Sequence, residues 1–224
     1  MGPACALARE LRGVAGILKV GSQLFTAEGP TAIERLAALG FGIFLDLKFH
    51  DIPNTVAGAV AAAARLPKVR LLTVHASGGL KMMQAAREAA GTGKNRPSLL
   101  GVTILTSLDA QALRRVGFAG SPQSRALALA RLAKTAGLDG VVASAREVRA
   151  IRRACGPGFL IVVPGVRPSS AARNDQARVA TPSEAIRAGA DYLVIGRPII
   201  AAPHPRRAAL EILEGIASAQ LRPR

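Results

Sequence analysis

The 224-residue chain is poor in aromatic residues, which make up 3% of it, and it has no tryptophan. Aromatic side chains are the platforms on which proteins stack single-stranded bases. Acidic residues are also few, with 14 against 30 basic ones, so the formal net charge is +16. That charge would attract phosphates, but the basic residues are dispersed along predicted helices, where a solvated face explains them. We therefore expect no nucleic-acid partner.

Long apolar runs and cysteines are scarce as well. Half of the residues are hydrophobic, yet no uninterrupted apolar stretch approaches the roughly 20 residues that a membrane-spanning helix requires. The first residues lack the apolar segment and cleavage site of a signal peptide. Cys5 and Cys155 are far apart and have neither the spacing of a metal site nor that of a disulfide framework. The sequence predicts a soluble, cytoplasmic protein with no membrane partner.

Short β-branched, apolar runs alternate with longer segments rich in alanine and leucine. This alternation is typical of βαβ units around a parallel sheet, and continuous apolar strands are covered on both faces. The predicted strands are residues 16–20, 42–47, 69–75, 99–105, 140–144, 159–163 and 192–195. The predicted helices are residues 31–39, 56–66, 80–90, 124–136, 145–154, 182–188 and 206–217. Periodicity leaves a closed barrel and a doubly wound sheet open, but polar residues at the strand ends favour the barrel.

The strand at residues 42–47 runs into alternating charges. Side chains at i and i+2 share one face of a strand, so Asp46 and Lys48 project together while Leu45 and Leu47 project to the other side. An edge strand with a solvated face would explain such a pair. A central strand of a parallel sheet has no free polar face, however, and buried ions cost several kcal/mol each unless they are paired. The pattern therefore indicates a functional site.

A second polar point lies near the C-terminus, where residues 190–195 read as a buried strand that ends in Gly196 and Arg197. Glycine lets a ligand approach the backbone, whose N–H groups favour an anion. Arg197 supplies a planar fork for phosphate, although a surface salt bridge would also explain it. In barrels, phosphate sites form from the loops after the last two strands. Arg167 and Gln176, which follow the preceding strand, suit the same site.

The segment D-x-K-x-x-D followed by Ile-Pro-Asn-Thr, at residues 46–55, resembles the signature of bacterial orotidine 5'-phosphate decarboxylases. The resemblance extends in the family's order over residues 18–21, 24–25, 74–79, 102–107, 164–168, 175–176 and 195–198. It implies a single (β/α)8 TIM barrel domain over residues 1–224. It also implies a lyase that needs no cofactor and no metal and converts orotidine 5'-phosphate to uridine 5'-phosphate and CO2 in de novo pyrimidine biosynthesis.

The resemblance assigns roles to individual residues. Lys48 is implied to be the proton donor, with Lys19, Asp46 and Asp51 completing a Lys-Asp-Lys-Asp array. Family members are homodimers, and Asp51 would reach into the partner's site. The implied substrate-binding residues are Thr55, Thr106, Arg167, Gln176, Gly196 and Arg197. For the two threonines, the alternative is a helix cap.

The family's first strand, which ends in Ala-Leu-Asp, has no counterpart in this sequence. Residues 6–14 carry the apolar spacing of a helix, with Leu7, Leu11 and Val14 on one face. The seven predicted strands would then match the second through eighth of the barrel. Either the start has been assigned too far downstream or the protein is a true truncation, and in both cases the sheet should have two unpaired edges.

Two other functions fit the sequence. One is a decarboxylase or aldolase of the same barrel group that acts on a sugar phosphate with a magnesium ion. The His-Asp-Ile-Pro-Asn-Thr segment at residues 50–55 suits the nucleotide enzyme better, and no acidic set calls for magnesium. The other is a catalytically dead barrel that retains only nucleotide binding or self-association. The complete charged array argues against it.

Overall fold

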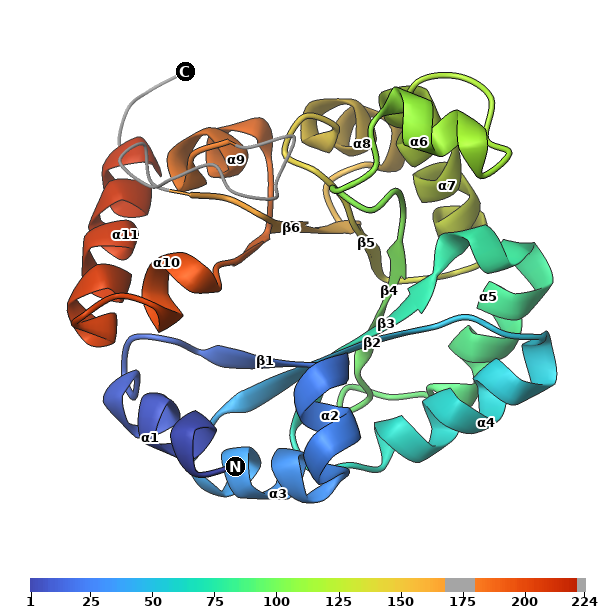
Figure 1. Cartoon of the computed structure of the whole chain (residues 1–224). Helices are drawn as coiled ribbons and strands as arrows, with labels where there is room; N and C mark the ends of the chain where they lie inside the picture. Colours follow the sequence, from blue (N-terminus) through green and yellow to red (C-terminus); the bar gives the residue numbers. More distant parts are fainter. Residues whose placement is uncertain (168–179, 221–224) are drawn as a thin grey trace.

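A computed structural model describes residues 1–167 and 180–220, with side chains to residue 218. In these residues seven parallel strands form one sheet in the order β1-β2-β3-β4-β5-β6-β7. The sheet curls into a ring surrounded by helices (Figure 1). The strands are β1 Ile17–Gly21, β2 Gly42–Phe49, β3 Val69–His75, β4 Ser98–Val102, β5 Gly140–Val142, β6 Leu160–Pro164 and β7 Tyr192–Val194. The predicted barrel is confirmed, as are all seven predicted strands.

The helices form the outer layer of the ring. They are α1 Gly2–Glu10, α2 Ser22–Glu28, α3 Thr31–Ala38, α4 Pro53–Ala64, α5 Gly79–Ala89, α6 Ala110–Arg115, α7 Pro122–Thr135, α8 Val148–Cys155, α9 Pro182–Ala188, α10 Arg197–Ile200 and α11 Pro205–Gln220, with a 3-10 turn at Ala76–Gly78. Every predicted helix is present. The helix expected at residues 6–14 begins earlier, with Pro3 in its first turn, and ends at Glu10.

Two predicted strands extend two or three residues beyond the observed ends, and the predicted strand at residues 192–195 extends one residue too far. The chain leaves β4 after Val102, where the Thr103 hydroxyl donates to the Val142 carbonyl at 3.0 Å. It leaves β5 after Val142, because the Ser144 backbone N–H turns to the buried carboxylate of Glu147 at 2.7 Å. The contact at Ser144 takes a backbone N–H away from the sheet ladder, and apolar patterning does not reveal it.

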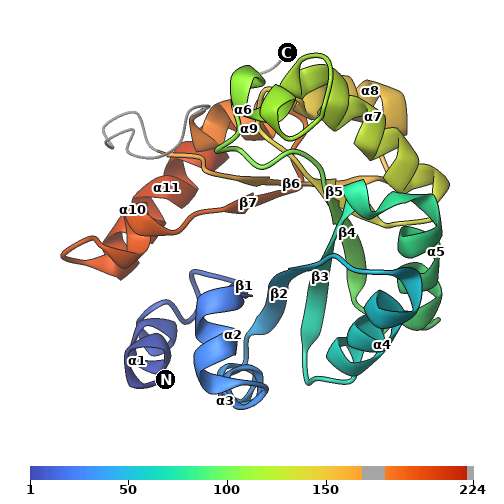
Figure 2. The ribbon, with the colours of Figure 1, turned by 45° about the vertical axis from the view of Figure 1, so that its right-hand side comes forward.

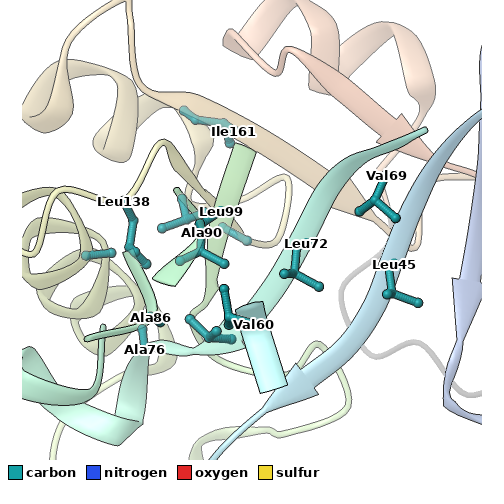
Figure 3. Close-up of a cluster of buried hydrophobic side chains, with 14 of the residues drawn as sticks. Leu45, Val60, Val69, Leu72, Ala76, Ala86, Ala90, Leu99, Leu138 and Ile161 are labelled. Atoms are coloured by element: carbon teal, nitrogen blue, oxygen red, sulfur yellow. The ribbon is translucent and has the colours of Figure 1, made fainter. Parts of the chain in front are cut away.

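The core has two layers, separated by the sheet. Inside the ring, a small apolar cluster takes side chains from all seven strands: Phe44, Leu71, Leu100 and Val162 are buried, and Ile17, Val142, Leu160 and Val194 are partly buried. Between the sheet and the helices lies a larger cluster, in which Leu45, Leu72, Leu99 and Ile161 pack against helix residues such as Val60 (Figure 3). Adjacent strand residues thus face opposite layers, as a period of two requires.

The sheet is not closed, because in the described residues no pairing joins β7 to β1. The two strands lie on either side of this break (Figure 2). The helical layer does bridge it. Arg206, at the start of α11, donates from its guanidinium to the carbonyls of Glu10 at 2.9 Å and Arg12 at 2.7 Å, beyond the end of α1. The expected unpaired edges are therefore present, and contacts between α1 and α11 hold the two sides together.

Candidate active site

The charged cluster continues the inner face of the barrel toward the C-terminal ends of its strands. Ile17 and Phe44 belong to the inner cluster, so Lys19 and Asp46, two residues further along β1 and β2, point inward at the next level. The register aligns Lys19 with Phe44 and Gly21 with Asp46. This is the end of a barrel at which enzymes of this architecture carry their active sites.

Two ammonium groups share one carboxylate at this level. Asp46 Oδ2 lies 2.8 Å from Lys48 Nζ and 3.3 Å from Lys19 Nζ. The Asp46 carboxylate is 10% exposed, whereas the two lysine side chains are about one-third exposed, at 33% and 35%. Burial raises the pKa of Asp46, but the hydrogen bond from Lys48 and the charge of Lys19 outweigh it, so the pKa lies below its ordinary value. The cluster holds two cations around one fixed anion.

The strand is irregular at Lys48. The pairing of β2 with β3 jumps from Leu45 opposite Leu72 to Phe49 opposite Val74. Lys48 itself has a φ of 54°, in the left-handed region that non-glycine residues rarely adopt. Irregularities of this kind re-aim side chains and are common beside active sites. The shared face predicted for Asp46 and Lys48 is confirmed by their ion pair, although regular strand geometry does not produce it.

Thr73 of β3 lies directly against this irregularity. Its hydroxyl donates to Asp46 Oδ1 at 3.1 Å and accepts the backbone N–H of Lys48 at 3.0 Å. The residue is fully buried. Sequence reasoning missed it, although a signal was available. Thr73 is a polar residue in the apolar strand Val69–His75, two positions after the inward-facing Leu71.

A cavity of about 190 Å³ lies over the cluster, inside the mouth of the barrel. Lys19, Asp46, Lys48 and the predicted binding residue Thr106 line it together with apolar residues of β2, β4, β5, β6 and β7: Phe44, Val102, Val142, Pro164 and Val194. Such a wall, mostly apolar with a few converging polar groups, is typical of a small-molecule site. A larger depression of about 540 Å³ lies around Ser98 and Leu160, where β4 and β6 begin. Its acid Asp139 is already paired with Arg96 at 2.7 Å.

Asp51 and Thr55 are not brought to the cluster of their own chain. Asp51 is exposed just before α4, and its carboxylate accepts the N–H of Ile52 at 2.6 Å. Among the ion pairs of the described residues, none joins Asp51 to Lys19 or Lys48. Thr55 is exposed in the first turn of α4. Between them, Ile52 exposes 66% of its surface.

The predicted phosphate residues lie in the segments after β6 and β7. Arg167 is buried, and its backbone N–H donates to the carbonyl of Ala180 at 3.0 Å. Gly196 is the N-cap of α10, and the exposed Arg197 begins that helix. A Cβ placed on Gly196 would meet no atom of the described residues within 4 Å. Those residues thus leave the space above Gly196 open. Gln176 lies outside the described residues.

Over residues 1–167 and 180–220, no group of three or more His, Cys, Asp or Glu side chains could hold a metal ion. In the same residues no helix combines the length and the apolar character needed to cross a lipid bilayer. Both cysteines are free, Cys155 buried and Cys5 partly so.

Comparison with known proteins agrees with this geometry. Residues 2–212 match the model of the "Orotidine 5'-phosphate decarboxylase / HUMPS family". The chain belongs to this family. It is 56% identical over 209 residues to orotidine 5'-phosphate decarboxylase of Anaeromyxobacter dehalogenans, covering 93% of this chain and 90% of that one. It is 55% identical over 205 residues to the enzyme of the same name from Nitrosococcus oceani, covering 92% and 88%.

Orotidine 5'-phosphate decarboxylase of Lactobacillus acidophilus has the same fold, as its solved structure shows. The two superpose with a TM-score of 0.78 at 38% identity over 88% of this chain and 85% of that one. The family resemblance noted in the sequence is therefore confirmed. Lys19, Asp46 and Lys48 lie toward the C-terminal ends of the barrel strands, where TIM-barrel enzymes carry their active sites.

Proposed function

We propose that this chain is an orotidine 5'-phosphate decarboxylase, a carboxy-lyase that converts orotidine 5'-phosphate to uridine 5'-phosphate and CO2 without a cofactor. Family membership supports the reaction. One observation carries the mechanism: two ammonium groups are held on a buried carboxylate, with a small cavity above them. In this proposal the whole chain forms one barrel domain that works in the cytoplasm in de novo pyrimidine biosynthesis.

Lys48 is the proton donor in this mechanism. The bond between the pyrimidine ring and its carboxylate breaks, CO2 departs, and the electron pair remains on the ring carbon. Lys48 Nζ transfers a proton to that carbon, and water later returns a proton to the amine. An ammonium already fixed beside the ring stabilises the charge as it develops, without the reorganisation that water would need. The 2.8 Å contact with Asp46 holds the Lys48 side chain in place.

Asp46 and Lys19 prepare the site for this step. The pKa of Asp46 lies below its ordinary value, so Asp46 is ionised and would stand near the departing carboxylate. Repulsion between the two would raise the energy of the bound substrate, while the ammonium groups favour the transition state. We assign the larger effect to the preorganised ammonium groups, because their interaction strengthens as charge moves onto the ring.

Arg197, Gly196, Arg167 and Gln176 bind the substrate phosphate in this proposal, and Thr55 and Thr106 contact the nucleotide. The open space above Gly196 supports close approach of an anion. The guanidinium of Arg197 offers parallel N–H donors to phosphate oxygens. The position of Thr106 on the cavity wall supports its contact with the nucleoside.

The protein works as a homodimer in this proposal, and Asp51 completes the partner's array. Three neighbouring features support this: Asp51 is exposed, it has no ion pair with its own cluster, and Ile52 beside it exposes 66% of its surface. An exposed apolar side chain next to an exposed acid suits a symmetric interface, where the same patch of both subunits meets.

The reaction is tested by following CO2 release and loss of the orotate absorbance in purified protein supplied with orotidine 5'-phosphate. Turnover should need no added metal and should survive a chelator. As a matched control, a β-keto sugar-acid phosphate with magnesium should not be decarboxylated. Turnover of the sugar phosphate alone would overturn the proposed function, and binding of the nucleotide without turnover would indicate an inactive barrel.

The role of Asp51 across the interface is tested by mixing two inactive variants, Lys48→Ala and Asp51→Ala. In a mixed dimer, one site has an intact Lys48 and receives Asp51 from its partner, while the other site lacks both. Equal mixing should therefore restore about a quarter of wild-type activity. A mixture as inactive as its components would show that Asp51 acts in its own subunit.

A further inference from the structure

Thr73 occupies a position that the mechanism has not used. Its fully buried hydroxyl lies between the carboxylate of Asp46 and the backbone N–H of Lys48. A hydroxyl has one proton to donate and lone pairs to accept with. Thr73 uses both, donating to Asp46 Oδ1 and accepting from the N–H of Lys48. Oδ2 of the same carboxylate receives the two ammonium groups.

The Thr73 hydroxyl accepts the Lys48 backbone N–H where the pairing of β2 with β3 is interrupted. Between Leu45 and Phe49 the register of β2 against β3 shifts. The Lys48 N–H there finds the Thr73 hydroxyl at 3.0 Å. Lys48 also has a φ of 54°, a conformation that persists only where the surroundings enforce it. The Thr73 hydroxyl is one such constraint, because it is buried and fixed by its second hydrogen bond.

We propose that Thr73 is a positioning residue, whose hydroxyl holds the Asp46 carboxylate and the strained Lys48 backbone in the geometry that the reaction requires. This inference rests on the proposed function. It assigns Thr73 no contact with the substrate, and Thr73 is not among the residues that line the cavity. Thr73 acts through Asp46 and Lys48 alone.

Two effects follow from loss of the hydroxyl. The Lys48 segment can relax, so Nζ is held less firmly over the cavity. Asp46 also loses a hydrogen bond to its ionised form, which raises its pKa. Substrate binding should change little, since the predicted phosphate residues lie in the segments after β6 and β7. A displacement of about 1 Å at a reacting group can lower the rate by about 10²-fold.

The test uses three variants. Thr73→Val keeps the branched shape and removes the hydroxyl, and Thr73→Ser keeps the hydroxyl and removes a methyl group. Thr103→Val is the matched control, because Thr103 is also a buried threonine whose hydroxyl bonds to a neighbouring strand, at the Val142 carbonyl. All three are compared with wild type for kcat, KM, the pH profile of kcat and the melting temperature.

We expect Thr73→Val to lower kcat by roughly 10- to 100-fold with KM nearly unchanged. The acidic limb of its pH profile should move toward neutral pH. Thr73→Ser and Thr103→Val should keep wild-type kcat. A wild-type kcat in Thr73→Val would overturn the inference. An equal loss in Thr103→Val would overturn it too, since any buried hydroxyl at the barrel mouth would then have the same effect.

A measurement without substrate separates this inference from the proposed function. In 15N-lysine-labelled protein, the Lys48 amide is identified by its loss in Lys48→Arg, and its hydrogen exchange is followed. Exchange should be slow in wild type and Thr73→Ser and faster in Thr73→Val. If wild type released no CO2 from orotidine 5'-phosphate, the proposed function would fail. Hydrogen exchange of the Lys48 amide would then be the only test of whether Thr73 positions Lys48. Equal exchange in wild type and Thr73→Val would overturn the positioning whatever the activity.

Discussion

β2 carries Asp46 and Lys48 and pairs with β1 on one side and β3 on the other, whereas β7 and β1 lie on either side of a break in the sheet. On the first side, Asp46 is fixed by Lys19, Lys48 and Thr73. On the second side, the predicted binding residues Gly196 and Arg197 lie in a four-residue helix and the turn before it. Asp46 and Lys48 thus stand on β2, which pairs with a strand on each side, and the predicted binding groups stand on segments beside an unpaired edge.

This difference predicts that substitutions in the two regions change different kinetic quantities. A fixed ammonium contributes mainly when charge develops in the transition state, so changes on the β2–β3 side should lower kcat. In the proposed function, the residues beyond β7 contact a part of the substrate that does not react. Changes there should weaken binding, and they should lower turnover only to the extent that binding energy is used in the transition state.

The largest effect is expected for Lys48→Ala. Without the proton donor, kcat should fall by about 10³-fold or more, while uridine 5'-phosphate still binds. Steady-state kinetics and calorimetric titration with the product measure the two quantities. Lys68→Ala is the matched control, since Lys68 is an exposed lysine with the same φ of 54°, located just before β3 at the other end of the barrel. Near-normal turnover in Lys48→Ala would rule out Lys48 as the proton donor.

A smaller effect is expected for Arg197→Ala. A charge-assisted hydrogen bond contributes about 1.5–3 kcal/mol, so kcat/KM for orotidine 5'-phosphate should fall roughly 10- to 100-fold. Orotidine without its phosphate serves as the control substrate, because its already slow reaction should be the same in both proteins. An equal loss with both substrates would show that Arg197 does not act through the phosphate.

Much of the barrel could be predicted from the sequence, because its buried strands are short apolar runs separated by helices of several turns. Helices α2, α6 and α10 were not predicted. They have seven, six and four residues, so each spans at most about two turns and shows the 3.6-residue period only weakly. Helix α7 begins at Pro122, two residues before the predicted start, because the Ser121 side chain caps it.

The geometry of the candidate site could be predicted only in part. The alternation in β2 indicates that Asp46 and Lys48 share a face, and their ion pair confirms this. Alternation assumes a regular strand, however, so it could not reveal the positive φ of Lys48 or the register shift beside it. For the same reason it did not indicate Thr73. The position of Asp51 in a neighbouring site remains a prediction, because it depends on a second subunit.

Stability at the break in the sheet is tested by Arg206→Ala. This change removes the hydrogen bonds from the guanidinium to the carbonyls of Glu10 and Arg12, which tie α11 to α1 where the strands do not pair. We expect a loss of about 1 kcal/mol, or a melting temperature lower by about 2–4 °C, with little change in kcat.

The next residue supplies the control for that experiment. Arg207 is 77% exposed and pairs with Glu211 within α11, an arrangement that contributes about 0.3–0.5 kcal/mol. Arg207→Ala should therefore lower the melting temperature less than Arg206→Ala. Equal melting temperatures for the two variants would show that the helical layer does not hold the break together.

The smallest expected effect is on the pH dependence of stability, and it concerns a residue of β3. His75, at the end of β3, has its pKa lowered from the ordinary value of 6.5, first by burial and then by the charges of His50 and Lys48, with Asp46 opposing them. The ring of His50 lies 5.3 Å away. Since its pKa in the folded protein is depressed, His75 stabilises the fold above pH 6.5. This contribution is lost as pH falls through the folded-state pKa, because the unfolded chain binds the proton more readily.

We therefore expect the wild-type melting temperature to fall between pH 7 and pH 5, and to fall less in His75→Gln, which cannot take up the proton. His204→Gln is the control, since His204 is exposed in the segment between α10 and α11 and should keep the wild-type pH dependence. Thermal unfolding of the three proteins at several pH values measures the difference. If His75→Gln and wild type lost equal stability on acidification, the acid sensitivity would arise from other groups, and the depressed pKa of His75 would have no part in it.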